Sequence, residues 1–211
     1  MSAATSTDFL ASMAASSRLR CEAARAQRSL ADLRTLIAGL PPAPKLSLSS
    51  AGFDLIAECK LRSPAVGTLR VAAEIDVGAT VTRYADAGAA AVSVLTEPDR
   101  FDGALEHLER AAAALALRGV PAMRKDFLVD EYQVLEARAA GAAGVLLILR
   151  MLERGALEAM LDTALEQNMF VLLEAFDATD VDLALRLLAP RKAAGNQLLL
   201  GVNCQIGRAH V

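Results

Sequence analysis

The sequence has few residues of the kinds that build metal sites or disulfide frameworks. Its 211 residues include no tryptophan, two histidines and three cysteines. The cysteines, Cys21, Cys59 and Cys204, are odd in number and far apart, with no short pair spacing. Neither a disulfide framework nor a zinc site is therefore indicated. With so little imidazole, proton transfer in an enzyme of this composition is expected to rest on lysines and carboxylates.

Positive charge and long apolar runs are also scarce. Lys and Arg number 22 against 25 Asp and Glu, a net charge of -3, so we expect no nucleic-acid partner. The longest uncharged apolar stretch, residues 139–149, is far short of the roughly 20 residues that span a bilayer. Asp8 precedes the first apolar patch, and no Lys or Arg stands before Arg18, which is the wrong charge order for a secretory signal. We therefore expect a cytoplasmic protein with no membrane partner.

From Leu55 onward, short apolar runs alternate with longer helical patterns. Alternation at even spacing is typical of β/α units on a parallel sheet. Runs such as LLIL and VLLLE show little polar alternation, as expected for strands buried on both faces. We predict strands that start near residues 55, 90, 121, 144, 170 and 198, and helices over residues 77–87, 104–117, 131–140, 153–167 and 179–188.

The region before these repeats has a different composition. Residues 9–40 are rich in Ala, Arg and Leu, and the prolines of residues 41–44 end this helical pattern. We predict an N-terminal helical extension over residues 1–50, with a flexible leader as the alternative. The repeats are about 29 residues long and an eight-unit barrel has ~250 residues, so the chain holds only about six units of a TIM (β/α)8 barrel. An open six-stranded sheet is the alternative, but no GxGxxG or GxxxxGK[ST] element follows any strand.

Polar residues lie at or just after the carboxyl ends of the predicted strands, where βα barrels hold their active sites. Because side chains alternate between the faces of a strand, Glu58 and Lys60 point to one side and Cys59 packs beneath a helix on the other. The full set is Glu58, Lys60, Ser93, Thr96, Arg124, Lys125, Arg150, Glu174 and Asn203.

The same alternation places Lys125 and Glu174 above apolar core positions. Loss of hydration disfavours the charged form of a buried lysine, and a nearby carboxylate favours that form again. One lysine acid and one glutamate base would suffice for acid–base catalysis. The alternative is a structural ion network that closes the barrel mouth. Arg124 and Asp126 flank Lys125 on the opposite face, where we expect them to form surface pairs.

Five segments resemble indole-3-glycerol phosphate synthase, a βα-barrel family of tryptophan biosynthesis. They extend over about three quarters of the chain in the family's order, and the ECKxxSP and KDF elements together are specific. The segments are IAECKLRSP from Ile56, SVLTEPDRFDGALEHL from Ser93, PAMRKDFLVDEYQVLEARAAGAAGVLLI from Pro121, LLEAF from Leu172 and GVN from Gly201.

The resemblance implies ring closure of 1-(2-carboxyphenylamino)-1-deoxyribulose 5-phosphate to indole-3-glycerol phosphate, with loss of carbon dioxide and water and with no metal or organic cofactor. Lys125 would be the general acid that protonates the ketone oxygen. Lys60 would contact the substrate carboxylate and share acid duty, and Glu58 would orient it. Glu174 would be the catalytic carboxylate, and Asn203 would hydrogen-bond the reacting part of the substrate.

The resemblance also implies contacts to the ends of the substrate. Ser63 matches a phosphate-contacting residue, and Phe101 matches the aromatic wall of the anthranilate pocket. The implied partner is thus a small phosphorylated molecule, and fusion or association with other tryptophan-pathway enzymes is compatible with the family. Two other hypotheses remain: a different phosphate-binding barrel enzyme, such as an isomerase of the same pathway, and a noncatalytic binding fragment.

The chain departs from the family pattern at three places. Leu61 and Ala65 replace polar or basic residues, which we expect to weaken loop contacts to the substrate. The match ends at Cys204, and residues 205–211 (QIGRAHV) look like a translated library adapter. We therefore expect residues 51–204 to form an incomplete barrel followed by a non-native tail. A sheet with open first and sixth strands is expected to aggregate, and the 211-residue chain to be inactive by itself.

Overall fold

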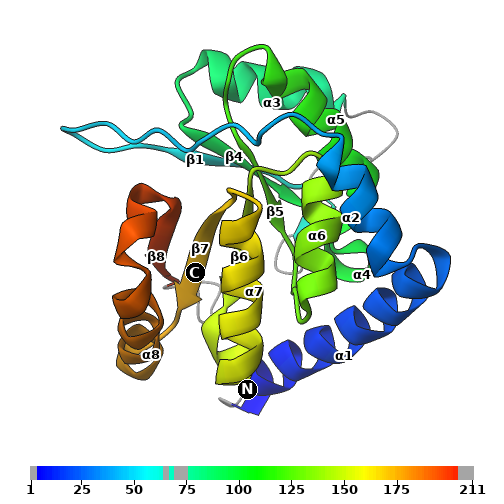
Figure 1. Ribbon diagram of the computed structural model, residues 1–211, viewed down its shortest axis with the longest axis vertical. Coiled ribbons are helices and arrows are strands. Elements are labelled where there is room, and N and C mark those ends of the chain that lie inside the picture. Colours follow the sequence, from blue (N-terminus) through cyan, green and yellow to red (C-terminus); the bar gives the residue numbers. More distant parts are fainter. Residues whose placement is uncertain (1–3, 64–66, 69–75, 204–211) are drawn as a thin grey trace.

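Six parallel strands form one curved sheet within residues 4–63, 67–68 and 76–203, the part of the chain that the computed structural model describes (Figure 1). Neighbours in the sheet follow chain order, so β1 and β8 are its two edge strands, as predicted. This arrangement confirms six β/α units on a parallel sheet. The strands are β1 (Ile56–Cys59), β4 (Ala91–Leu95), β5 (Ala122–Lys125), β6 (Gly144–Ile148), β7 (Phe170–Ala175) and β8 (Leu198–Val202).

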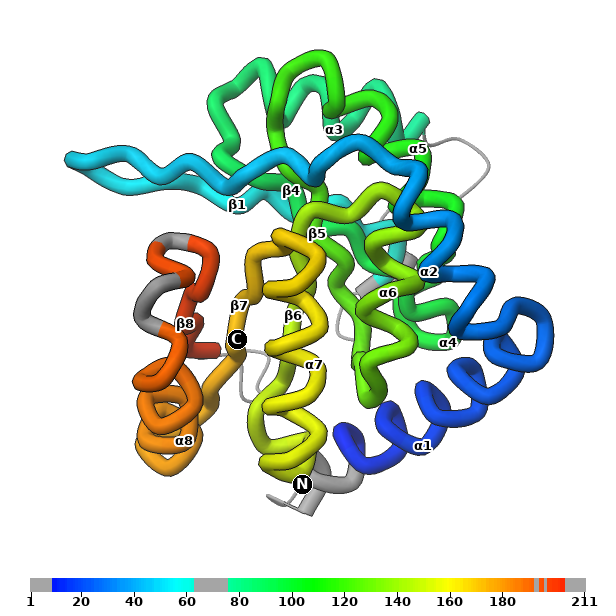
Figure 2. Tube along the Cα trace, in the orientation of Figure 1, coloured from blue at the N-terminus to red at the C-terminus, as the bar shows by residue number. Residues whose placement is uncertain are grey.

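Helices alternate with these strands and cover the convex face of the sheet (Figure 2). Three of them have an aspartate at the N-cap. Asp76, Asp130 and Asp177 each accept a hydrogen bond from a backbone amide of the first turn, which satisfies a donor that has no partner within the helix. The predicted helices agree with the observed ones to within one or two residues. They are α3 (Val77–Asp86), α5 (Leu105–Ala116), α6 (Glu131–Ala139), α7 (Arg154–Glu166) and α8 (Ala178–Leu188), with the shorter α4 (Pro98–Phe101), η2 (Leu149–Met151) and η3 (Ala189–Gln197).

The largest apolar cluster lies between the sheet and these helices. Val92, Val145 and Val171 come from β4, β6 and β7, and Leu108 comes from α5. Cys59 is buried in the same cluster, which confirms the prediction that it faces a helix. The side chains at alternate positions therefore point to the concave face.

A smaller apolar cluster fills the base of the concave face. Met123 and Phe170 pack there with Leu46, which comes from the extended segment after the N-terminal helices. Gly144 is required in this layer because a Cβ at that position would overlap the ring of Phe170. The strand ends above this layer are thus supported from below.

The N-terminal helical region is two helices, α1 (Ala4–Gln27) and α2 (Leu30–Ala38). The chain turns at Ser29, which accepts from the amide of Asp32 at 3.2 Å while the Asp32 carboxylate accepts from the amide of Ser29 at 3.3 Å, a capping box. Helix α1 contacts α6 and η2 and so lies across the carboxyl ends of the strands (Figure 2). No helix in the described residues is long and apolar enough to cross a membrane.

Candidate active site

Charged side chains converge on the concave face at the carboxyl end of the sheet. Glu58, at the end of β1, accepts from the Lys60 Nζ at 2.5 Å through one oxygen and from the Lys125 Nζ through the other. The side chains of Glu58, Lys60 and Lys125 are 26%, 31% and 34% exposed. They are therefore held in place by one another and still open to a ligand.

Two further residues complete this group, which we call the inner cluster: Glu58, Lys60, Lys125, Glu174 and Asn203. Glu174 ends the inward-facing row of β7, and the Asn203 amide Nδ2 donates to its Oε1 at 2.9 Å. The positive charge of Lys125 and the negative charge of Glu58 both act on Glu174. The structure thus brings together all five residues that the resemblance assigned to catalysis.

The two carboxylates of the inner cluster differ in proton affinity. Burial would raise the pKa of Glu58, but the charge of Lys125 and the hydrogen bonds from Lys125 and Lys60 outweigh it, so this pKa lies below its ordinary value. For Glu174, burial outweighs the attraction of Lys125 and the hydrogen bond from Asn203, so its pKa lies above its ordinary value. Carboxyls whose pKa values are pushed apart are suited to different roles, one as a fixed charge and one as a proton carrier.

Aromatic side chains pack against the strands next to the inner cluster, in an apolar group that includes Leu172 of β7. Phe101, at the end of α4, lies with its ring centroid 6.2 Å from that of Phe127, and Phe9 of α1 meets Phe127 edge-on at 5.8 Å. Leu146 and Ile148 of β6 belong to the same apolar group. Of these rings, sequence reasoning named only Phe101. Phe127 could have been flagged by its place in the KDF element, whereas nothing in the sequence connects Phe9 to this site.

The first loop is described only in part. Ser63 belongs to the short strand β2 (Arg62–Ser63), which pairs antiparallel with β3 (Gly67–Thr68), but its side chain lies outside the described residues, as do Ala65 and residues 204–211. Arg62 connects this loop to Asp102 at 3.4 Å. Leu61 is buried, so it packs inside the protein.

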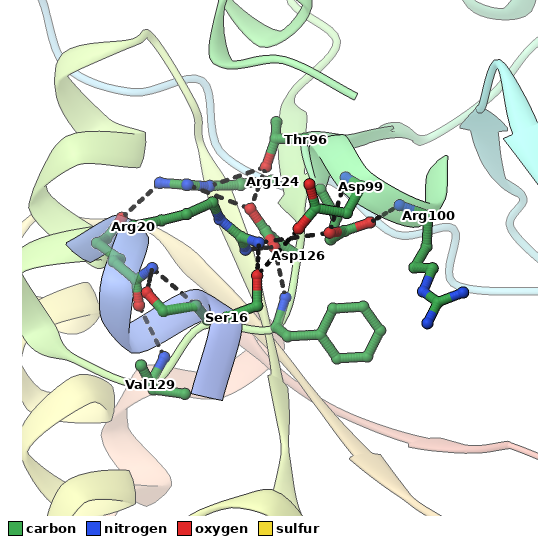
Figure 3. Close-up of polar contacts among 12 residues, drawn as sticks. Ser16, Arg20, Thr96, Asp99, Arg100, Arg124, Asp126 and Val129 are labelled. Atoms are coloured by element: carbon green, nitrogen blue, oxygen red, sulfur yellow. Dashed lines mark hydrogen bonds and ion pairs between the residues drawn. The ribbon is translucent and has the colours of Figure 1, made fainter. Parts of the chain in front are cut away.

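The side chains that flank Lys125 on the other face form a second group (Figure 3). Arg124 and Asp126 are 5% and 3% exposed, so the expectation of surface pairs is wrong. Arg124 pairs with Glu136 of α6 at 2.7 Å, and the Thr96 hydroxyl donates to Asp126 at 2.8 Å. Helix α1 adds an arginine to this group. We call it the outer network: Arg20, Thr96, Glu97, Arg124, Asp126 and Glu136.

The described residues were also compared with the donor sets that bind metal ions. Within the described residues, no group of three or more His, Cys, Asp or Glu side chains is placed to hold a metal ion.

The family model described as indole-3-glycerol phosphate synthase matches residues 10–203. The chain belongs to the indole-3-glycerol phosphate synthase family. The match includes every member of the inner cluster and the outer network, so both lie within the part of the fold that the family shares.

Three curated synthases illustrate the relationship. The indole-3-glycerol phosphate synthase of a Nocardioides species is 43% identical over 180 residues, which are 84% of this chain and 64% of that protein. Those of Leptothrix cholodnii and Laribacter hongkongensis are 38% and 39% identical, and each alignment covers 93% of this chain and 72% of the relative. The chain thus spans about two thirds of the length of these synthases. Among solved structures, the carboxyl transferase domain of Rhizobium etli pyruvate carboxylase aligns with 68% of this chain and 24% of that chain at 15% identity and a TM-score of 0.42.

Proposed function

We propose that the protein is a carbon–carbon lyase that closes the indole ring: it converts 1-(2-carboxyphenylamino)-1-deoxyribulose 5-phosphate to indole-3-glycerol phosphate with loss of carbon dioxide and water. The observation that carries this proposal is the inner cluster, in which Lys125 lies within electrostatic reach of two carboxylates of opposite pKa shift. Membership of the synthase family supports the same reaction. No metal or organic cofactor is needed in this proposal.

Lys125 acts as the general acid of ring closure. Attack of the aromatic carbon on the substrate ketone builds negative charge on the ketone oxygen, and an ammonium held in place stabilises that charge more in the transition state than in the ground state. The pairing with Glu58 fixes the direction of the Lys125 side chain before substrate arrives. Such an acid accelerates a reaction by ~10² to 10⁴-fold.

The remaining members of the inner cluster divide the binding and proton transfers. Lys60 contacts the substrate carboxylate and shares acid duty in dehydration, while Glu58, whose lowered pKa keeps it ionised, orients both lysines. Glu174 has a raised pKa and therefore takes up a proton more readily than an ordinary carboxylate does. Asn203 orients Glu174 and hydrogen-bonds the reacting part of the substrate.

The two ends of the substrate contact different kinds of side chain. The anthranilate ring packs against Phe101 beside Phe127 and Phe9, and Ser63 contacts the phosphate. The partner is thus a small phosphorylated molecule. A substrate of biosynthetic metabolism is consistent with a cytoplasmic location, and association with other enzymes of the tryptophan pathway belongs to the same proposal.

The test is a direct assay of the reaction. Because the curated synthases are longer than this chain, the gene product that spans their full length is incubated with the substrate, and indole fluorescence and carbon dioxide release are followed together. We expect both signals to rise in step, and to be absent in the Lys125→Met variant. A protein that binds the substrate and releases no carbon dioxide would be a binding module. One that leaves the substrate unchanged but produces it from its phosphoribosyl precursor would be the isomerase. Either result overturns the proposal.

A further inference from the structure

Helix α1 contributes one side chain to the outer network around the end of β5 (Figure 3). The guanidinium of Arg20 lies 2.7 Å from the Asp126 Oδ1 and 3.4 Å from the Glu97 Oε1. The side chains of Asp126 and Glu97 are only 1% and 0% exposed. A buried carboxylate without a positive partner is costly, so Arg20 supplies charge where the fold needs it.

Charge balance in the outer network depends on this residue. Three carboxylates, those of Glu97, Asp126 and Glu136, meet two guanidiniums, those of Arg20 and Arg124. Arg124 is closest to Glu136, at 2.7 Å, and lies 3.3 Å from Asp126. Without Arg20, Glu97 would lose its ion pair with that guanidinium, and Asp126 would lose the shorter of its two ion pairs.

The network holds the backbone on both sides of Lys125. Arg124 and Asp126 are its direct neighbours, and both point away from the inner cluster into buried contacts. The amide of Thr96 donates to the carbonyl of Lys125 at 3.0 Å. Because neighbouring side chains on an extended strand point to opposite faces, fixing Arg124 and Asp126 directs Lys125 toward Glu58.

Docking of α1 does not rest on Arg20 alone. The Gln133 amide of α6 donates to the Ser17 hydroxyl at 2.9 Å, and the Tyr132 hydroxyl donates to the carbonyl of Arg28 at 2.9 Å, directly after α1. Leu10 also packs in the apolar group of the site. Loss of the Arg20 charge therefore leaves α1 in place and disturbs chiefly the end of β5.

We propose that Arg20 is a positioning residue for Lys125, and that helix α1 sets the direction of the general acid through the ion pair of Arg20 with Asp126. The role of Lys125 in this inference rests on the proposed function. Arg20 itself is a quarter exposed and points at Asp126, so it acts through its neighbours.

The kinetic test compares Arg20→Gln with Arg34→Gln in the full-length gene product. Arg34 is exposed on α2 and serves as the matched control. We expect Arg20→Gln to lower kcat by about 10- to 100-fold, the loss expected from a misplaced catalytic group, with KM little changed. Arg20→Lys should recover part of the loss, Arg34→Gln should behave as wild type, and Arg20→Gln should add no further loss to Lys125→Met. If the wild type is active and Arg20→Gln has the same kcat, the inference is overturned. It is also overturned if the double variant loses kcat by the product of the two single losses.

A second readout needs no activity. In the full-length gene product, amide hydrogen exchange of Thr96 and Phe127 should become about tenfold faster in Arg20→Gln, the size of effect that a lost charged hydrogen bond produces, while the amides of β7 stay unchanged. Faster exchange throughout the sheet would indicate a general loss of stability and overturn the inference, as would no change at Thr96. An inactive full-length wild type that shows the local exchange effect overturns the proposed function and leaves Arg20 as the residue that orders the end of β5.

Discussion

Two groups of paired acidic and basic side chains lie on opposite sides of the end of β5. Lys125 belongs to the inner cluster. The side chains of Glu58, Lys60 and Lys125 are 26% to 34% exposed, so solvent reaches all three. Arg124 and Asp126, its neighbours in the chain, belong to the outer network and are almost fully buried. The presence of ion pairs alone therefore does not distinguish the two groups, whereas their burial does.

Burial separates a group that can react from one that positions. In the outer network, each buried carboxylate is matched by a guanidinium, a hydroxyl or a backbone amide, so a proton or a ligand has little access. In the inner cluster, Glu58 and Glu174 have pKa values displaced in opposite directions, which is typical of sites that transfer protons. Substitutions in the inner cluster should consequently cost activity, and substitutions of the almost fully buried members of the outer network, Arg124 and Asp126, should cost stability.

The largest effect is expected for Lys125→Met. This variant of the full-length protein should lose ring closure by ~10² to 10⁴-fold because the general acid is gone. Its free energy of unfolding should change by about 1 kcal/mol or less, because Lys125 is partly exposed and Glu58 keeps Lys60 as a partner. Steady-state kinetics and urea unfolding measure the two quantities. Arg124→Met is the matched variant, and it should show the larger loss of stability; a Lys125→Met enzyme that keeps most of its turnover removes the distinction between the two groups.

The next effect is on stability and concerns Asp126. Asp126→Ala should lower the free energy of unfolding of the full-length protein by about 3 to 5 kcal/mol, because it leaves Arg124 buried with fewer partners. The comparison is Glu58→Ala in the inner cluster, where exposure to water limits the loss to about 1 kcal/mol. Urea unfolding at neutral pH measures both. Equal losses would mean that the outer network is no more structural than the inner cluster.

The sheet and the inner cluster could be predicted from the sequence because both depend on local pattern. Apolar runs and helical periodicity place the six strands, and alternation along a strand places Glu58 opposite Cys59. Parallel strands bring their carboxyl ends to one edge, so residues far apart in the chain, such as Lys125 and Glu174, meet there without any further signal.

The outer network could not be predicted because its burial comes from a distant segment. Nothing near Arg124 and Asp126 in the sequence indicates that α1 covers them, and charged residues on a strand end are more often exposed. The turn at Ser29, which separates α1 from α2, is marked in the sequence by the capping pair Ser29 and Asp32. The path of α1 across the strand ends, and with it the place of Arg20 and Phe9, is a tertiary property.

The smallest effect divides the inner cluster itself, through the opposite pKa shifts of its two carboxyls. Glu58 has a folded-state pKa below its ordinary value, so its ionised form stabilises the fold above the ordinary carboxyl range, and this contribution is lost as pH falls through the folded-state pKa. Glu174 has a folded-state pKa above its ordinary value, so the folded protein binds that proton more tightly and the ionised form costs stability at neutral pH.

Glutamine substitutions should therefore shift stability in opposite directions. At pH 7, Glu58→Gln should lower the free energy of unfolding and Glu174→Gln should raise it. Both changes should be about 1 kcal/mol or less, because both side chains are partly exposed. The gain in Glu174→Gln should fade as pH drops through the folded-state pKa toward the ordinary carboxyl value, and the loss in Glu58→Gln should fade at lower pH still. Urea unfolding across this pH range measures both changes. In Glu174→Gln, the glutamine oxygen can still accept the hydrogen bond from Asn203. If the two variants moved in the same direction, the carboxylates would share one environment, and the division between a fixed charge and a proton carrier in the inner cluster would fail.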